Sequence, residues 1–281
     1  FSPSTKSEKL QASPNSPWRS IICYEVPPAT ISRLFPENFI LPAYWTSRAD
    51  KARYLRHRIS QMKYNDTKFR QHPQFGLAAR QLIHVFVDMS NILIGFWDTL
   101  KKLRGMEETR RIIAPPLSFN NLSKLMIRDR TADTRCVVGS HGSRDLQRIK
   151  ELMETAEALK YKTMLLQRVP ASGARRQYEQ GVDEILHLKM LQSLLDHTGR
   201  PATMVLATGD AKSAQYSDGF KRYVERALDL GWNVELYAWR KGFSKEWEDA
   251  IFVKRWGLQF KVFMLDEWVE ELLDITIESI Q

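Results

Sequence analysis

The chain has 281 residues, of which 43% are hydrophobic and 27% are charged, and this balance is typical of a globular protein with a sizeable core. No apolar run approaches the length of about eighteen residues that a membrane-spanning helix needs, so we expect no membrane association. Two cysteines, Cys23 and Cys136, exclude a disulfide framework or a cysteine zinc site. We expect reduced thiols in an intracellular protein, cytoplasmic or nuclear.

The positive charge is concentrated at the start of the chain. Residues 1–80 hold thirteen Lys and Arg against five Asp and Glu, whereas residues 81–281 are nearly balanced at +1 within a total of +9. A basic segment beside a neutral domain suits a phosphate-backbone partner, and a solvated tail without a ligand is the alternative. Because the sequence begins with Phe, we expect a piece of a longer protein.

Residues 1–80 are predicted to be a basic, partly disordered N-terminal extension. Residues 1–20 are rich in Ser and Pro and are typical of a linker, and residues 52–64 predict a short basic helix. Aromatic residues lie between the basic ones in this extension. They can stack on single-stranded nucleic acid or pack onto the following domain, and the sequence does not separate the two. These aromatic residues are Tyr44, Trp45, Tyr54, Tyr64 and Phe69.

From residue 82 onward, short apolar strands alternate with helices. The predicted strands are Leu82–Val87, Arg135–Val138, Lys162–Leu166, Thr203–Ala207, Val234–Ala238 and Phe260–Met264. The predicted helices are 91–103, 115–128, 145–160, 181–196, 220–230, 244–254 and 266–273, the fourth with an apolar face at Ile185, Leu188, Leu191 and Leu195. This alternation predicts an α/β domain over residues 81–275, with three α/β/α layers around a mainly parallel, Rossmann-like sheet.

Acidic residues follow two of the predicted strands. Asp88 comes directly after the first, and Asp210 comes shortly after the fourth, so the two carboxylates meet at one crevice if these strands are neighbours. Asn91 lies one helical turn after Asp88, Asp183 begins a helix, and Asp218 precedes another. Taken singly, each Asp is also a candidate helix cap or turn residue.

Clustered carboxylates repel one another unless a cation neutralises them, and hard oxygen ligands select Mg²⁺ or Mn²⁺. Such a cation supports hydrolysis of a phosphodiester bond. The chain contains no Gly-x-x-x-x-Gly-Lys loop, no Gly-x-Gly-x-x-Gly after the first strand and no Gly-x-Ser-x-Gly elbow. These absences argue against an ATPase, a dinucleotide enzyme and a serine hydrolase. The residues therefore predict a metal-dependent phosphodiesterase.

Three ordered segments resemble the motifs of NYN domains, a family of PIN-like nucleases, and are most similar to fungal members. They are VDMSN at 87–91, GVDEILHLKML at 181–191 and LATGDAKSAQYSDGF at 206–220, and the resemblance runs from about residue 81 to about residue 273. It implies a PIN-like fold and a Mg²⁺- or Mn²⁺-dependent endoribonuclease that acts on single-stranded RNA, often as a homodimer. It also implies that Asp88, Asp183, Asp210 and Asp218 bind metal and that Asn91 orients a ligand or the phosphate.

The chain departs from the family pattern in the third motif, where an insertion separates Asp210 from Asp218. The insertion places Lys212 near the metals, where it can hold the scissile phosphate or replace part of a metal's charge. Ser140 and His141, after the second strand, are further candidates for substrate contact. The alternative hypothesis is a catalytically inactive NYN module that binds RNA or a protein partner, and a nuclease of structured DNA is a weaker one.

Overall fold

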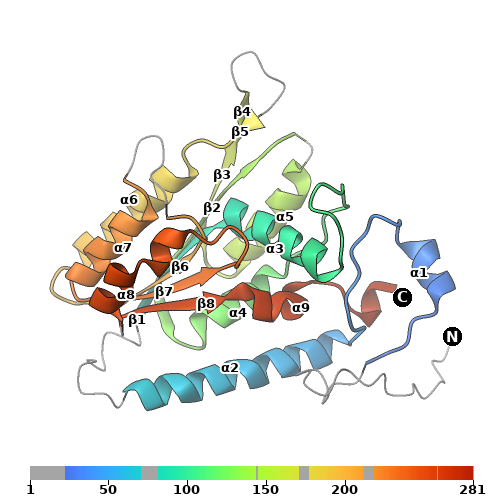
Figure 1. Ribbon diagram of the computed structural model, residues 1–281, viewed down its shortest axis with the longest axis horizontal. Helices are drawn as coiled ribbons and strands as arrows, with labels where there is room; N and C mark the ends of the chain where they lie inside the picture. The colour runs from blue at the N-terminus through green and yellow to red at the C-terminus, as the bar shows by residue number, and fades with distance from the viewer. Residues whose placement is uncertain are drawn as a thin grey trace.

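The protein is an α/β fold built on a six-stranded sheet, seen here in a computed structural model that describes residues 23–70, 82–143, 145–170, 177–211, 218–257 and 259–280 (Figure 1). All strands of the sheet are parallel, in the order β3-β2-β1-β6-β7-β8. The strands are β1 (Leu82–Asp88), β2 (Thr131–His141), β3 (Lys162–Gln167), β6 (Thr203–Ala207), β7 (Asn233–Ala238) and β8 (Phe260–Met264). A separate antiparallel pair joins β4 (Val169–Pro170) to β5 (Gln177–Tyr178).

Helices cover both faces of the sheet and produce two hydrophobic cores. One core lies under α3 (Met89–Leu103), α4 (Phe119–Ile127), α5 (Leu146–Ala158) and α9 (Val269–Leu272), and the other under α6 (Val182–Asp196), α7 (Phe220–Asp229) and α8 (Ala250–Trp256). Short 3-10 helices occupy Lys245–Glu248, Leu265–Trp268 and Ile277–Ile280. This arrangement confirms the predicted three-layer α/β/α fold. None of the described helices is long and apolar enough to cross a lipid bilayer.

The strand order reverses next to β1. The chain leaves β1 toward β2 and β3, returns to form β6 on the other side of β1, and continues to β7 and β8. Val87 of β1 is in register with Ala207 of β6, so the carboxyl ends of the two strands lie side by side. Ligands of open parallel sheets bind at such a reversal, because the loops diverge there and leave a crevice.

The N-terminal segment packs onto the domain as far as the structure describes it. Helix α1 (Pro28–Leu34) precedes the long helix α2 (Arg48–Arg70), which runs along the α4 and α9 side of the molecule (Figure 1). Trp45, Leu55 and Ile59 are buried in the same core as β1. Residues 1–22 and the side chains of Tyr64 and Phe69 lie outside this description.

Basic residues of α2 contact the C-terminal segment. Lys51 is buried, and its Nζ donates to the carbonyl oxygens of Leu273 at 2.7 Å and Ile275 at 2.9 Å. The Arg58 guanidinium pairs with Glu271 and lies over the Trp268 ring, 3.7 Å from its centroid. These two cations therefore hold α2 on the domain.

Several predicted elements differ from the structure in their bounds, among them the helix predicted at 52–64, which is α2 (Arg48–Arg70), and three further differences have a clear physical reason. Strand β2 is longer than predicted, because its first half pairs with β1 alone and carries partly exposed polar residues that hide the strand pattern. Helix α6 buries Val182, Leu186, Met190 and Leu194, while Leu188 and Leu195 are exposed, since the helix is apolar on more than one side. The predicted helix 244–254 is interrupted at Asp249, whose side chain accepts from the Phe252 amide and begins α8.

A buried ion-pair network joins the sheet to the end of α4. Both carboxylate oxygens of Glu235, on β7, accept from Arg128 at 2.6 Å and from Arg130 at 2.8 Å. Burial opposes the ionisation of Glu235, but the charges of Arg130 and Arg128 outweigh it and lower its pKa from 4.5 to about 2. Removing one member of such a network leaves buried charges uncompensated, which is strongly destabilising.

We therefore expect Glu235→Gln to lower the free energy of unfolding at neutral pH by about 3–5 kcal/mol, measured by urea denaturation. The control Glu248→Gln alters an exposed carboxylate and should change it by less than about 0.5 kcal/mol. Because the folded-state pKa of Glu235 lies below its ordinary value, the stabilisation is present above pH 4.5 and is lost as the pH falls toward 2. A difference between wild type and Glu235→Gln that stays constant over this range would contradict the assignment.

Candidate active site

Asp88 lies at the carboxyl end of β1 and is 3% exposed. It also caps α3, since its Oδ1 accepts from the backbone amide of Asn91 at 3.0 Å. Its Oδ2 accepts from the Thr208 hydroxyl, which follows β6, at 3.1 Å. Asp88 can therefore cap α3 and still bind a ligand. The Asn91 amide and the Thr208 hydroxyl fix its carboxylate at the crevice and leave lone pairs for a further ligand.

The loop after β6 is held against α3 by its backbone. The Gly209 amide donates to Asn91 Oδ1 at 2.8 Å, and the Asp210 amide donates to Thr208 Oγ1 at 3.3 Å. A Cβ atom on Gly209 would lie 2.9 Å from the carbonyl oxygen of Gly242, so a larger residue would push two backbone segments apart. Asn91 thus acts on the site by positioning the Thr-Gly-Asp turn.

Three of the predicted Asp residues influence one another electrostatically, together with Glu179. Burial, and then the charges of Asp183 and Glu179, raise the pKa of Asp88 well above its ordinary value, while its hydrogen bonds to Asn91 and Thr208 act in the opposite direction. Burial, followed by the charges of Asp210, Glu179 and Glu184, raises the pKa of Asp183 to about 7. Burial is the larger cause of both shifts, and the charges of the neighbouring carboxylates add to it.

The carboxylates nevertheless stand apart. Among the described residues, three metal-ligating side chains have atoms within 4.8 Å of one another at a single place, which is His84, Asp133 and His197. Asp88, Asp183 and Asp210 therefore do not form a closed cage. Mg²⁺ usually keeps several waters and is held by one or two carboxylates, so a wider set of oxygen donors fits it. Asp88, Asp183 and Asp210 are the residues that would hold Mg²⁺ or Mn²⁺.

A row of hydrogen-bonded polar side chains lies next to these carboxylates at the carboxyl ends of the strands. The Ser140 amide donates to Ser90 Oγ at 3.1 Å, and Arg168 Nε donates to Ser140 Oγ at 3.0 Å. The Ser140 hydroxyl in turn donates to Glu179. This chain of bonds connects a cation, Arg168, to the carboxylates, and sequence reasoning missed both Arg168 and Glu179 because they follow β3 and β5 without any motif.

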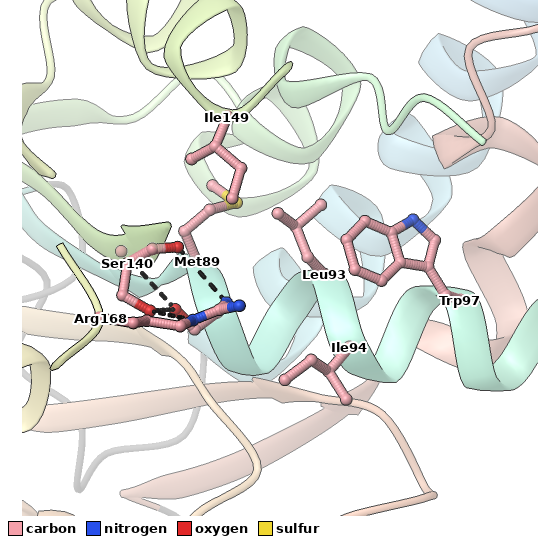
Figure 2. Close-up of a pocket in the computed structure, with 9 residues that line it drawn as sticks. Met89, Leu93, Ile94, Trp97, Ser140, Ile149 and Arg168 are labelled. Carbon is pink, nitrogen blue, oxygen red and sulfur yellow. Dashed lines mark hydrogen bonds between the residues drawn. The ribbon is translucent and has the colours of Figure 1, made fainter. Parts of the chain in front are cut away.

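Figure 2 shows Arg168 beside Ser140 at the end of α3 that carries Met89, with Leu93 and Trp97 further along the same helix. The pocket that these residues line has a volume of about 10 Å³, room for about one water molecule. It is therefore too small for a substrate.

The structure places the other predicted site residues as follows. Ser140 and His141 end strand β2 instead of lying in a loop. Ser140 is 2% exposed and its hydroxyl is engaged, so it positions neighbouring groups, whereas His141 is partly exposed. Lys212 lies outside the described residues.

Asp218 is the predicted ligand that differs most from the others. Its side chain is 64% exposed and pairs with Arg226 at 3.5 Å. Its charge raises the pKa of His187, against the larger lowering by burial, and it is not among the charges that shift Asp88 or Asp183. Asp218, the carboxylate that follows the insertion, therefore lies outside the group formed by Asp88, Asp183 and Asp210.

Comparisons with protein-family profiles, with curated proteins and with solved structures give no match for this chain. The resemblance to NYN domains accordingly stays a prediction from the three motifs. The fold and the arrangement of Asp88, Asp183 and Asp210 are the basis on which a function is argued.

We expect Asp88→Asn to abolish metal binding without destabilising the metal-free protein. Because the substitution removes a buried charge from a repelling group, the metal-free variant should melt no more than about 2 °C below the wild type, or above it. The rise in melting temperature that Mg²⁺ gives the wild type should be lost, as measured by circular dichroism. Asp229→Asn, an exposed control, should keep that rise. An equal rise in wild type and Asp88→Asn would exclude Asp88 as a ligand.

Proposed function

We propose that this protein is a metal-dependent endoribonuclease of the NYN type, which hydrolyses phosphodiester bonds of single-stranded RNA with Mg²⁺ or Mn²⁺. The observation that carries the proposal is the coupled set of Asp88, Asp183 and Asp210 at the reversal point between β1 and β6. Parallel sheets bind ligands there, and gathered carboxylates at such a point call for a divalent cation.

The chemistry is divided between the cation and the chain. A bound divalent ion supplies Lewis-acid stabilisation of the charge that develops on a phosphate during hydrolysis. Asp88 provides a fixed oxygen donor, because Asn91 and Thr208 hold both of its oxygens in place. Asn91 holds the turn that carries Asp210 through the Gly209 amide.

The contacts of Arg168 favour a substrate that contains phosphate. Its guanidinium makes one good hydrogen bond, to Ser140, and two long contacts of 3.4 and 3.5 Å to Asp145 and the Ser140 carbonyl. A guanidinium has five N–H donors, and its weak contacts can be exchanged for the oxygens of a phosphate. A cation on the same edge as the carboxylates would hold the backbone of the nucleic acid, while RNA as the substrate follows from the motif resemblance.

The proposal is tested by cleavage of an end-labelled single-stranded RNA with Mg²⁺ or Mn²⁺. We expect the wild type and the control Asp229→Asn to cut, and chelation to abolish cutting. Asp210→Asn should reduce the cleavage rate by at least about a hundredfold, since loss of even an outer partner of a metal site costs about 10–100-fold. Equal cleavage by wild type and Asp210→Asn would contradict the assignment of the site.

A second candidate function is a catalytically inactive module that binds RNA or a protein. The exposed position of Asp218 and its pairing with Arg226 favour it, because they leave the coupled group one carboxylate short of the family pattern. RNA that is bound but left intact with either metal would select this module over the nuclease.

A further inference from the structure

A second cluster of metal-ligating side chains lies at the other end of the sheet. His84 is on β1, Asp133 on β2 and His197 caps the carboxyl end of α6, and their ligand atoms all lie within 4.8 Å of one another. His197 Nε2 is 3.7 Å from Asp133 Oδ2. His84 lies four positions before Asp88 on β1, a distance of about 13 Å along the strand, so this cluster is separate from the carboxylate site.

Asp133 is the extra residue of a β-bulge in β2. Ile83 is in register with Ala132, but the next residue, His84, is in register with Thr134, so Asp133 is the extra residue of β2. In such a bulge two residues face one residue of the partner strand, which redirects their side chains. Asp133 thus lies next to His84 on the neighbouring strand but outside the regular pairing.

His84 is fully buried without a hydrogen bond. Its side chain is 0% exposed, and neither ring nitrogen has a hydrogen-bond partner within the described part of the chain. Its ring packs against His197, with centroids 4.5 Å apart, and against Trp232 at 4.9 Å. Buried polar groups are almost always paired, so an unpaired buried imidazole that faces two other ligand groups indicates a missing partner.

The orientation of His197 is suitable for a ligand. Its Nδ1 lies 3.2 Å from the carbonyl oxygen of Ser193, and a carbonyl only accepts, so Nδ1 is the donor in this bond. The proton on Nδ1 leaves the lone pair on Nε2, the nitrogen that faces Asp133. A backbone carbonyl that fixes the ring in this way is the usual outer partner of a metal-bound histidine.

We propose that His84, Asp133 and His197 bind a divalent transition metal of the zinc class, which ties β1 and β2 to the carboxyl end of α6. Two imidazoles and one carboxylate suit Zn²⁺, whereas Mg²⁺ prefers oxygen ligands. Three protein ligands leave a fourth position for water, and Asp133, whose side chain is 48% exposed, gives access to solvent. The ion stabilises the fold and takes no part in the reaction proposed for the carboxylate site.

The test measures binding of Zn²⁺ to the full chain, with excess Mg²⁺ present and with Asp88→Asn as the background, so that the carboxylate site does not contribute. We expect one Zn²⁺ per chain by calorimetry and a rise in melting temperature of about 2 °C or more. Asp133→Ala, at a half-exposed position, should weaken Zn²⁺ binding at least about tenfold and remove the rise. His57→Gln, which alters an exposed histidine of α2, should retain both.

His84→Phe gives a second test, because Phe keeps the aromatic packing and removes the unpaired nitrogens. The metal-free variant should be at least as stable as its parent, and Zn²⁺ should no longer stabilise it. Co²⁺ should give the visible absorption of a bound ion with the parent and not with Asp133→Ala. If His84→Phe does not fold, Asp133→Ala decides alone. The absence of Zn²⁺ binding by the parent, or equal binding by the parent and Asp133→Ala, would overturn the proposal.

Discussion

The site depends on the hydrogen bonds that join the end of β1 to the loop after β6. Thr208 donates to Asp88, and the Gly209 amide donates to Asn91, so the two strand ends are held together beside Asp183, whose charge raises the pKa of Asp88. Close packing of α3 against the sheet supports this contact. A Cβ atom on Gly95 would lie 2.2 Å from Cδ1 of Trp239, so glycine allows the helix to approach the sheet closely. The fold thus keeps like charges near one another, which is the condition for binding a cation.

The amino and carboxyl ends of the parallel strands carry different metal-ligating groups. At the carboxyl edge the donors are carboxylates, with Arg168 alongside, and at the amino edge they are two imidazoles and one carboxylate. Helix α6 connects the edges, because its first turn carries Asp183 and its carboxyl cap is His197. Its 15 residues span about 22 Å. An ion held by His197 would therefore steady the helix that positions Asp183, which gives the amino edge a structural link to the proposed nuclease site.

The fold was predictable from the sequence because buried parallel strands are short apolar runs, and β6 and β8 were predicted with their observed ends. The positions of Asp88 at the end of β1 and of Asp210 shortly after β6 were predictable, because both strands are apolar runs that end near an acid in the sequence. Glu179 and Arg168 were missed because no sequence motif marks them. They meet at Ser140 only through tertiary contacts. The cluster of His84, Asp133 and His197 was missed for the same reason, since it joins distant segments through a bulge that no periodicity reveals.

The central claim is that the carboxylates between β1 and β6 form a site for a divalent cation. Electron paramagnetic resonance of Mn²⁺ tests it directly, because the signal of free Mn²⁺ falls as the ion binds, with no need for a substrate. We expect the wild type to bind Mn²⁺ and Asp183→Asn, which removes a carboxylate with a pKa of about 7, to bind it at least about tenfold more weakly. A wild type that leaves Mn²⁺ free, or an Asp183→Asn variant that binds it equally well, would show that these carboxylates are not a cation site.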